Sequence, residues 1–410
     1  MVETPRTLGA ADATVHCAPF SRPWARWFRE RAAACRVKTL ASILLFLYAA
    51  LPTAIAAEES RKPVGTASIA MKNPIDSRAF VSEFWFEAAT GSSVEGFAVR
   101  PPLRAIEIAR NAEPAPHQHK RPLVVVSHGN WGTRYSQGWL SIRLVNAGFV
   151  VLSTSHPGTL GEDQSIAGRL RLWDRSRDVS FALTELLKHP KWSSMIDETR
   201  IAFAGHSFGG WTGVSLAGGK YDPAAQRTFC EKSPAKDFYC EGTLKDDIDG
   251  IKTSDAAESF RDSRFKAFYL MATGPGQGFS LESLGSIDVP FMVDTAKADE
   301  ILEPTANSSA LARLIPGAKE IVRPVGHFAY VPECKWLIGP LIARFAGTPI
   351  CTDPAGVDRG LVHKQVAEDA IAFFNAHLMV RKERAALQAR PANAPPQAKE
   401  DPSPGATSSR

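Results

Sequence analysis

The chain has few cysteines, and beyond its first 56 residues it has no marked excess of positive charge. Its six cysteines in 410 residues form no C-x-x-C pair, which argues against a metal or redox site built on thiolates. The formal net charge is +5, but residues 1–56 hold seven of the 48 Lys and Arg residues and only three of the 43 Asp and Glu residues. The rest of the chain is close to neutral, so nothing indicates nucleic acid as a partner.

Long apolar runs are also scarce, and the clearest one lies near the start of the chain. Residues 40–57 are apolar, follow basic residues, and include the small residues 54–56 that a signal peptidase accepts. We expect residues 1–56 to be a leader with a cleaved signal peptide, which predicts a periplasmic or secreted protein without a stable membrane span. An uncleaved membrane anchor is the alternative, but Pro52 and a run barely long enough for a bilayer of about 30 Å argue against it.

Four cysteines remain after the leader, and their even number fits export. In an oxidising compartment they allow three pairings. The local pairing, Cys230–Cys240 with Cys334–Cys351, closes two short loops in regions that otherwise look irregular. The alternative is four reduced thiols in a cytosolic enzyme, which applies if the leader is not a signal peptide.

The composition indicates a globular protein, because 44% of the residues are hydrophobic and 9% are aromatic. We expect a linker at 57–76, with ordered structure beginning near Ser77, and one domain over 77–380. A disordered tail rich in Pro and Ala follows at 381–410. Residues 218–264 lack sustained periodicity and are interpreted as an insertion over the site. We expect the protein to be a monomer.

The pattern of the domain alternates between strands and helices. Residues 81–87 and 93–100 are expected to form two antiparallel strands, and 104–121 a hydrophilic loop. Continuous apolar runs, typical of strands buried on both faces, then alternate with amphipathic stretches. The expected strands are 122–127, 149–154, a run around 201–203, 265–271, 289–293 and 319–324; the expected helices are 138–146, 169–187, the stretch after 207, and 361–380. This alternation predicts a mostly parallel sheet with helices on both faces.

The stretch Gly205-His206-Ser207-Phe208-Gly209 lies between a strand-like run and a helix-like run. Glycines two residues before and two after a serine allow strand and helix to pack closely while the hydroxyl stays exposed at the helix N-terminus. Ser207 is therefore the candidate nucleophile. The backbone amide of Phe208 is expected to point at the oxyanion that forms on a substrate carbonyl.

A second loop, His128-Gly129-Asn130-Trp131-Gly132, follows the buried strand 122–127. Loops at the carboxyl ends of parallel strands are where α/β folds bind ligands. We expect the amide of Asn130 to be the second oxyanion donor, although an ordinary strand-to-helix turn is the alternative. Aromatic residues after it could line an acyl or alcohol pocket, or could equally belong to the core. These residues are Trp131, Tyr135 and Trp139.

A serine hydroxyl needs a histidine to remove its proton and a carboxylate to orient that histidine. His327, in Pro-Val-Gly-His-Phe-Ala after the last predicted strand, is the candidate base. Asp299 is the preferred acid because its loop could reach His327. Asp294, at the strand end itself, is the alternative, and Glu300 ranks below both. The order Ser, Asp, His is the one expected for an α/β-hydrolase sheet. This chemistry requires neither a metal nor another cofactor.

These motifs together resemble the α/β-hydrolase superfamily, and more narrowly the predicted dienelactone hydrolases that are similar to platelet-activating factor acetylhydrolases. The resemblance covers roughly residues 77–380 and implies an α/β-hydrolase fold and a serine esterase acting on short acyl esters of small molecules or lipids. Two features depart from those families. Dienelactone hydrolases use a cysteine nucleophile where this chain has Ser207. The segment 270–275, where animal acetylhydrolases carry the acid, has no carboxylate here.

The sequence therefore predicts an exported serine hydrolase that cleaves carboxylic esters through an acyl-enzyme intermediate. An acyltransferase or a peptidase could use the same three residues, and an inactive module that only binds a ligand is a further alternative. The natural ester cannot be read from the sequence, because the pocket depends on how the insertion folds over the site.

Overall fold

The structure is a computed structural model that describes residues 62–232, 237–240, 256, 258–335, 339 and 349–378. All of them belong to one compact unit. The predicted leader with its signal peptide at 1–56 and the predicted tail at 381–410 lie outside the described residues. None of the helices in the described ranges is long and apolar enough to cross a bilayer.

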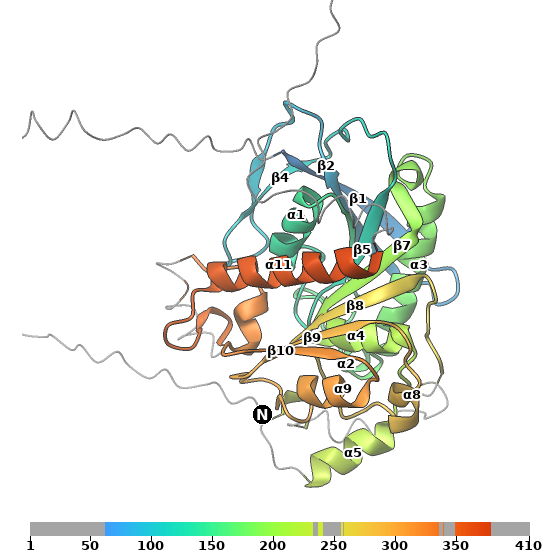
Figure 1. The fold of residues 1–410 in the computed structure, drawn as a ribbon, viewed down its shortest axis with the longest axis vertical. Coiled ribbons are helices and arrows are strands. Elements are labelled where there is room, and N and C mark those ends of the chain that lie inside the picture. Colours follow the sequence, from blue (N-terminus) through green and yellow to red (C-terminus); the bar gives the residue numbers. More distant parts are fainter. Residues whose placement is uncertain are drawn as a thin grey trace, which may run out of the picture. The chain divides into compact units, whose positions relative to one another are not determined.

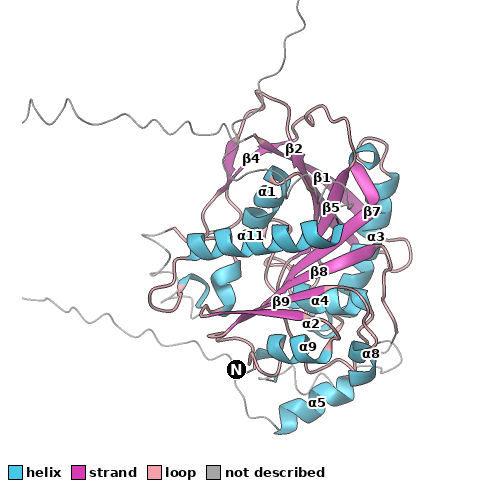
Figure 2. Ribbon diagram, viewed as in Figure 1, coloured by secondary structure: helices cyan, strands magenta, loops and turns pink. Residues whose placement is uncertain are grey.

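The strands of the described chain form one central sheet (Figure 2). Its ten strands follow the order β10-β9-β8-β7-β5-β6-β2-β1-β4-β3. They are β1 (Val64–Lys72), β2 (Ala79–Glu87), β3 (Glu95–Phe97), β4 (Ile106–Arg110), β5 (Arg121–Ser127), β6 (Val150–Thr154), β7 (Ile196–His206), β8 (Phe265–Met271), β9 (Phe291–Ala296) and β10 (Lys319–Arg323). The strands from β10 to β6 run parallel, and β2 joins β6 antiparallel. The prediction of a mostly parallel sheet is confirmed.

Helices cover both faces of this sheet, as predicted. The α-helices are α1 (Gly138–Asn146), α2 (Ile166–Leu170), α3 (Trp173–Lys188), α4 (Phe208–Ala217), α5 (Pro223–Lys232), α8 (Leu281–Gly285), α9 (Ser308–Leu314) and α11 (Arg359–Leu378). Helices α1 and α11 share one hydrophobic core with the sheet, and α3 and α4 share the other. Figure 1 shows α11 crossing the near face of the strands while α3 and α4 lie behind them.

The central strand β5 shows why an uninterrupted apolar run folds in this way. Leu123 and Val125 point into the core that contains α3 and α4, whereas Val124 and Val126 point into the core that contains α1 and α11. All four side chains are buried. A strand covered on both faces needs apolar residues at every position, because successive side chains point to opposite sides of the sheet.

The expected linker at 57–76 is wrong over its second half, because residues Val64–Lys72 form β1. This strand pairs antiparallel with β2 along its whole length. Its polar residues suggested a linker, but the Ser68 hydroxyl donates to Oε2 of Glu83 at 2.6 Å. Polar side chains can occupy a buried strand when they find hydrogen-bond partners there.

Two other predictions for the N-terminal part also need correction. The segments 81–87 and 93–100 do not pair with each other: β2 lies between β1 and β6, and the short β3 pairs with β4. Strand β4 lies within the segment 104–121 that was expected to be a loop. Ile106 and Ile108 are buried on either side of the exposed Glu107, and this spacing of two is the signal for a half-buried strand.

The single long helix expected at 169–187 is divided into α2 and α3. Asp174 lies in the first turn of α3, where a negative charge is favoured by the helix dipole. Its carboxylate also pairs with Arg171 and Arg177 at 3.1 and 3.2 Å. These interactions favour a new helix start at this point.

Both predicted disulfides, Cys230–Cys240 and Cys334–Cys351, are present in the structure. The first lies in the insertion expected at 218–264. The described part of this insertion contains α5 and a short 3-10 helix, Phe238–Cys240. The prediction of a small insertion that carries a disulfide after α4 is therefore confirmed.

Candidate active site

The backbone at Ser207 has the strained conformation expected for a serine at a sharp turn between strand and helix. It connects β7 to α4 with φ 56° and ψ −118°, a region that non-glycine residues rarely occupy. A Cβ on Gly205 would lie 2.2 Å from the carbonyl oxygen of Gly209, and a Cβ on Gly209 would lie 2.0 Å from that of Ser127. Both glycines are therefore required for strand, turn and helix to pack this closely.

The structure brings Ser207, His327 and Asp299 together in a continuous hydrogen-bonded row. Ser207 Oγ lies 3.0 Å from Nε2 of His327, and Nδ1 of His327 lies 2.8 Å from Oδ2 of Asp299. His327 opens a 3-10 helix, His327–Tyr330, after β10, and Asp299 follows β9. All three side chains lie beyond the carboxyl ends of parallel strands, where α/β folds place ligands.

The surroundings of the imidazole favour its charged form. Burial opposes the charge, but the carboxylates of Asp299, Glu300 and Asp237 outweigh it and raise the pKa of His327. Asp299 is itself fixed, because its Oδ1 accepts hydrogen bonds from the amides of Ile301 and Leu302 at 2.9 and 2.8 Å. An imidazolium formed during a reaction would find its partner already oriented.

Asp294, the alternative acid, has different partners. It is fully buried, and its two oxygens accept hydrogen bonds from the hydroxyls of Tyr330 and Tyr269 at 2.8 and 2.7 Å. The guanidinium of Arg323 pairs with it at 2.9 Å. Of the two aspartates, only Asp299 contacts the ring of His327.

The loop after β5 packs directly on the candidate nucleophile. A Cβ on Gly129 would lie 3.0 Å from the Cβ of Ser207. Within the described ranges, the amides of Asn130 and Phe208 donate to no other protein group, whereas the Trp131 amide donates to the carbonyl of Thr159 at 2.9 Å. Two unpaired amides next to the serine are what an oxyanion site requires.

A buried polar network behind this loop was missed by the sequence analysis. The Arg175 side chain in α3 is 1% exposed, and its guanidinium donates to the carbonyl of His128, to Ser127 Oγ at 3.3 Å and to Thr159 Oγ1 at 2.5 Å. Burial lowers the pKa of Arg175 to about 9. Arg175 thus holds the loop that carries Asn130. It also holds Thr159, whose carbonyl accepts the Trp131 amide.

The same network continues through Asp178, also in α3. Its carboxylate receives a bidentate contact from Arg78 at 3.0 Å and lies 3.1 Å from Nδ1 of His156. The other ring nitrogen of His156 contacts Ser127 Oγ at 3.0 Å. The sequence gives little signal for this network, because Asp174, Ser176 and Arg177 make the start of α3 resemble a solvated helix face.

For Trp131, Tyr135 and Trp139 the sequence left open a pocket or the core, and the structure places Tyr135 and Trp139 in the core. Trp131, in the loop after β5, is 53% exposed, but Tyr135 and Trp139 are 4% and 5% exposed. Tyr135 donates to Oε2 of Glu83 at 2.8 Å, and the Trp139 indole donates to the carbonyl of Tyr330 at 3.0 Å. Both side chains belong to the core that contains α1 and α11. They can be buried there because their polar atoms find hydrogen-bond partners.

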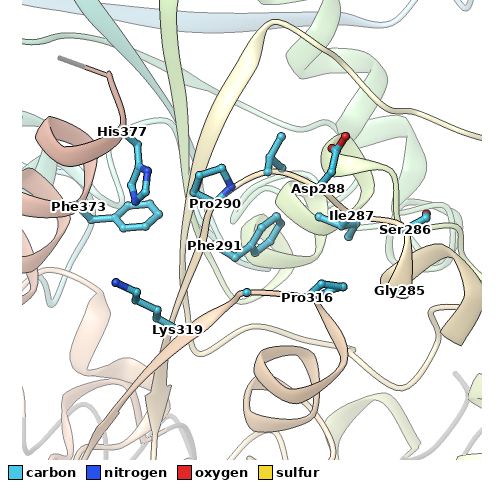
Figure 3. Close-up of a pocket in the computed structure, with 12 residues that line it drawn as sticks. Gly285, Ser286, Ile287, Asp288, Pro290, Phe291, Pro316, Lys319, Phe373 and His377 are labelled. Carbon is cyan, nitrogen blue, oxygen red and sulfur yellow. The ribbon is translucent and has the colours of Figure 1, made fainter. Parts of the chain in front are cut away.

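A cavity of about 630 Å³ lies at the amino-terminal ends of β9 and β10 (Figure 3). It is lined by Phe291 and Lys319, the first residues of β9 and β10, and by Phe373 and His377 of α11. The candidate catalytic side chains follow the other ends of these strands. This cavity is therefore separate from the Ser207 site.

No family model matches the chain, and comparison with solved structures identifies its fold. A solved structure of a ferulic acid esterase from Streptomyces cinnamoneus has a TM-score of 0.51 and 19% sequence identity, covering 82% of this chain and 96% of the esterase. The chain has the α/β-hydrolase fold. The predicted α/β-hydrolase fold is therefore confirmed, and Ser207, Asp299 and His327 occur along the chain in the order that this fold uses.

Sequence relatives cover a smaller part of the chain. Cutinase 2 of Thermobifida cellulosilytica is 33% identical over 101 residues, which are 24% of this chain and 35% of that protein. Cutinase cut1 of Thermobifida fusca is 33% identical over 101 residues, 24% of this chain and 29% of that protein. The matched region thus spans about a third of the length of these curated relatives.

Proposed function

We propose that this protein is a serine hydrolase that cleaves carboxylic esters. The observation that carries the proposal is the row of contacts from Ser207 Oγ through His327 to Asp299, at 3.0 and 2.8 Å. A hydroxyl within hydrogen-bond reach of an imidazole that is oriented by a carboxylate is the general arrangement of an activated nucleophile. The similar proteins named cutinase and ferulic acid esterase are ester hydrolases by name, which supports an ester as the substrate class.

In the first half of the reaction, Ser207 Oγ attacks the ester carbonyl while Nε2 of His327 takes the hydroxyl proton. The carbonyl oxygen becomes an oxyanion held by the amides of Asn130 and Phe208. Asp299 stabilises the imidazolium, which then gives its proton to the departing alcohol. The alcohol leaves, and the acyl group remains on Ser207 as an ester.

In the second half, water replaces the alcohol. His327 removes a proton from water as the water oxygen attacks the acyl-enzyme, and the same two amides hold the second oxyanion. Collapse of this intermediate breaks the bond to Ser207 Oγ, which recovers its proton from His327. One ester and one water are converted to one carboxylic acid and one alcohol, and the enzyme is regenerated.

We propose short acyl chains for the substrate, with acetyl esters of phospholipid-like alcohols as one candidate. The core positions of Tyr135 and Trp139 leave no apolar pocket at those two residues for a long chain. We also propose that the protein is exported and acts as a monomer on small-molecule or lipid esters. The two disulfides support an oxidising compartment. N-terminal sequencing of the exported protein tests the proposed loss of residues 1–56.

Turnover of p-nitrophenyl acetate, butyrate and octanoate tests the function. We expect the rate to fall with chain length and Ser207→Ala to reduce it to background. Ser286→Ala, at an exposed position after α8, is the control and should keep the wild-type rate. Wild-type turnover by Ser207→Ala would reject the nucleophile. Product analysis with an added alcohol or amine then separates hydrolysis from acyl transfer.

A further inference from the structure

The insertion after α4 contacts the loop that carries Asp299. We call residues 237–240 the bracing segment; the disulfide Cys230–Cys240 links it to α5. The backbone amide of Phe238 donates to the carbonyl oxygen of Ile301 at 2.9 Å. The amide of the same Ile301 donates to Oδ1 of Asp299. The bracing segment therefore holds the turn that orients the proposed catalytic acid.

Asp237, the first residue of the bracing segment, is fully buried, and its carboxylate is surrounded by N–H donors. Its Oδ2 accepts from Asn307 Nδ2 at 2.7 Å and from Gln277 Nε2 at 2.8 Å, and its Oδ1 accepts from the Tyr239 amide at 3.0 Å. Asn307 Nδ2 also donates to the carbonyl of Glu303 at 2.9 Å. The side-chain amide of Asn307 thus connects Asp237 to Glu303, in the loop that carries Asp299.

Among the described residues, the hydrogen-bond donors named above to the Asp237 carboxylate are all neutral N–H groups. No Lys, Arg or His within the described ranges forms an ion pair with it. Burial raises the pKa of this carboxyl, but hydrogen bonds from Asn307, Gln277 and the backbone of Tyr239 and Glu303 oppose that rise, because N–H donors favour the ionised form. A buried charge held by neutral dipoles keeps its field, because low-dielectric surroundings screen it weakly.

The nearest consequence of this field is at His327. The carboxylates that act on its ring are Asp299 and Glu300 from the loop after β9 and Asp237 from the insertion. The neighbouring His206 ring, 4.9 Å away between centroids, is neutral, because burial lowers its pKa well below the usual range. Asp299 contacts the ring of His327, and Glu300 accepts its backbone amide. Asp237 makes neither contact and acts on the ring through its charge alone.

The bracing segment also packs against the oxyanion side of the site. The ring of Tyr239 meets the ring of Phe208 edge to face, with centroids 6.1 Å apart. Its hydroxyl donates to the carbonyl of Arg169 at 2.8 Å. The same four residues therefore contact both the loop of the acid and the residue whose amide faces the substrate oxygen.

We propose that Asp237 is a positioning residue for the reaction, held in place by the disulfide Cys230–Cys240. It fixes the loop of Asp299 through Asn307 and through the amide of Phe238 beside it, and its negative charge stabilises the imidazolium that forms on His327. The inference rests on the proposed function. It assigns to the insertion a role in the chemistry beyond covering the site.

The test compares Asp237→Asn with the wild type. The variant keeps the shape of the side chain and removes the charge, so the acid limb of the kcat/KM profile should move to lower pH by about half a unit, with kcat reduced about tenfold. Asp288→Asn is the charge control, because that carboxylate is 66% exposed and pairs with Arg261 on the surface. Its profile should match the wild type. An unshifted Asp237→Asn profile overturns the proposal.

The disulfide provides a second variant if Asp237→Asn does not fold. Replacing Cys230 and Cys240 by serine frees the bracing segment, and the same downward shift of the acid limb is expected. Replacing Cys334 and Cys351 by serine is the matched control, since that disulfide lies outside the insertion, and should leave the limb in place. Coincident profiles for the two double variants overturn the role of the tether.

A measurement without substrate separates this inference from the proposed function. The ring pKa of His327 can be followed by NMR on histidine-labelled protein, with the signal assigned by its loss in His327→Gln. A lower ring pKa in Asp237→Asn supports the positioning role even if no ester is hydrolysed, in which case only the proposed function fails. An unchanged ring pKa in a hydrolytically active protein rejects the positioning role alone.

Discussion

The backbone amide of His327 donates a hydrogen bond to Oε2 of Glu300 at 2.9 Å. The residue next to Asp299 therefore holds the main chain of the same histidine whose ring Asp299 contacts. This approach depends on Gly326, because a Cβ there would lie 2.6 Å from Oε2 of Glu300. Two adjacent carboxylates thus have separate tasks, one at the imidazole and one at the backbone.

Glu300→Gln is predicted to change the pH dependence more than the maximal rate. Glutamine keeps an oxygen that accepts the His327 amide, but it removes one of the charges that raise the pKa of His327. Since the base must be neutral to react, the acid limb of kcat/KM should move to lower pH, with kcat at high pH within about threefold of wild type. Glu300→Ala should also lower kcat. An unshifted limb in Glu300→Gln would contradict this assignment.

Asp299→Asn and Asp294→Asn should separate catalysis from stability. We expect Asp299→Asn to reduce kcat by about 10²- to 10⁴-fold with little change in the free energy of unfolding, because it alters the partner of His327 Nδ1. Asp294→Asn should keep kcat but lower the free energy of unfolding by roughly 3 kcal/mol, since it breaks a buried pair with Arg323. Ester turnover and urea unfolding measure the two effects. The reverse result would make Asp294 the acid.

The fold of the parallel part could be predicted because its signals are local. The apolar, β-branched run of β5 and the glycines around Ser207 each fix a strand or a turn without distant partners. The polar strand β1 could not be recognised, because Ser68 fits a sheet only once Glu83 of β2 lies opposite and accepts its hydrogen bond. Its formation is decided by tertiary contacts.

The same distinction applies to the site. The strand-end positions of Ser207, Asp299 and His327 follow from the alternation of strands and helices, and their catalytic roles stay predictions. The choice between Asp299 and Asp294 depends on where Tyr269 and Tyr330 place their hydroxyls, which a sequence does not state. The roles of Arg175 and Asp237 were not predicted, because charged residues are normally solvated and only the folded structure buries these two.

Acid should destabilise the protein through its buried neutral histidines. Burial lowers the pKa of His128, His156, His206 and His363, the last to about 3. Above about pH 6.5 these groups are neutral in both states; below it the unfolded chain binds protons that the folded chain does not. Each such histidine should cost up to about 1.4 kcal/mol per pH unit as the pH falls, until its folded pKa is reached.

His327 has the opposite effect on the pH dependence of stability, and His363 allows the predicted slope to be tested. The pKa of His327 is raised, so its contribution stabilises the folded state at low pH and is lost as the pH rises. Urea unfolding between pH 7 and 5.5 measures the sum, and we expect the free energy of unfolding to fall. His363→Gln should give a shallower fall than the wild type. Equal slopes would contradict the neutral state of His363.

Trp131 and Trp139 should respond differently to truncation, because one is exposed and the other is core. Trp139 donates to the carbonyl of Tyr330 and stacks on His363 with centroids 4.0 Å apart, so Trp139→Ala should cost about 3–5 kcal/mol of stability. Trp131→Ala should leave stability within about 0.5 kcal/mol. If the exposed indole contacts substrate, the variant should raise KM for p-nitrophenyl acetate about threefold to tenfold, the usual value of one aromatic contact. An unchanged KM would leave Trp131 without a role in binding, and the preference for short acyl esters would then have to arise from other residues around Ser207.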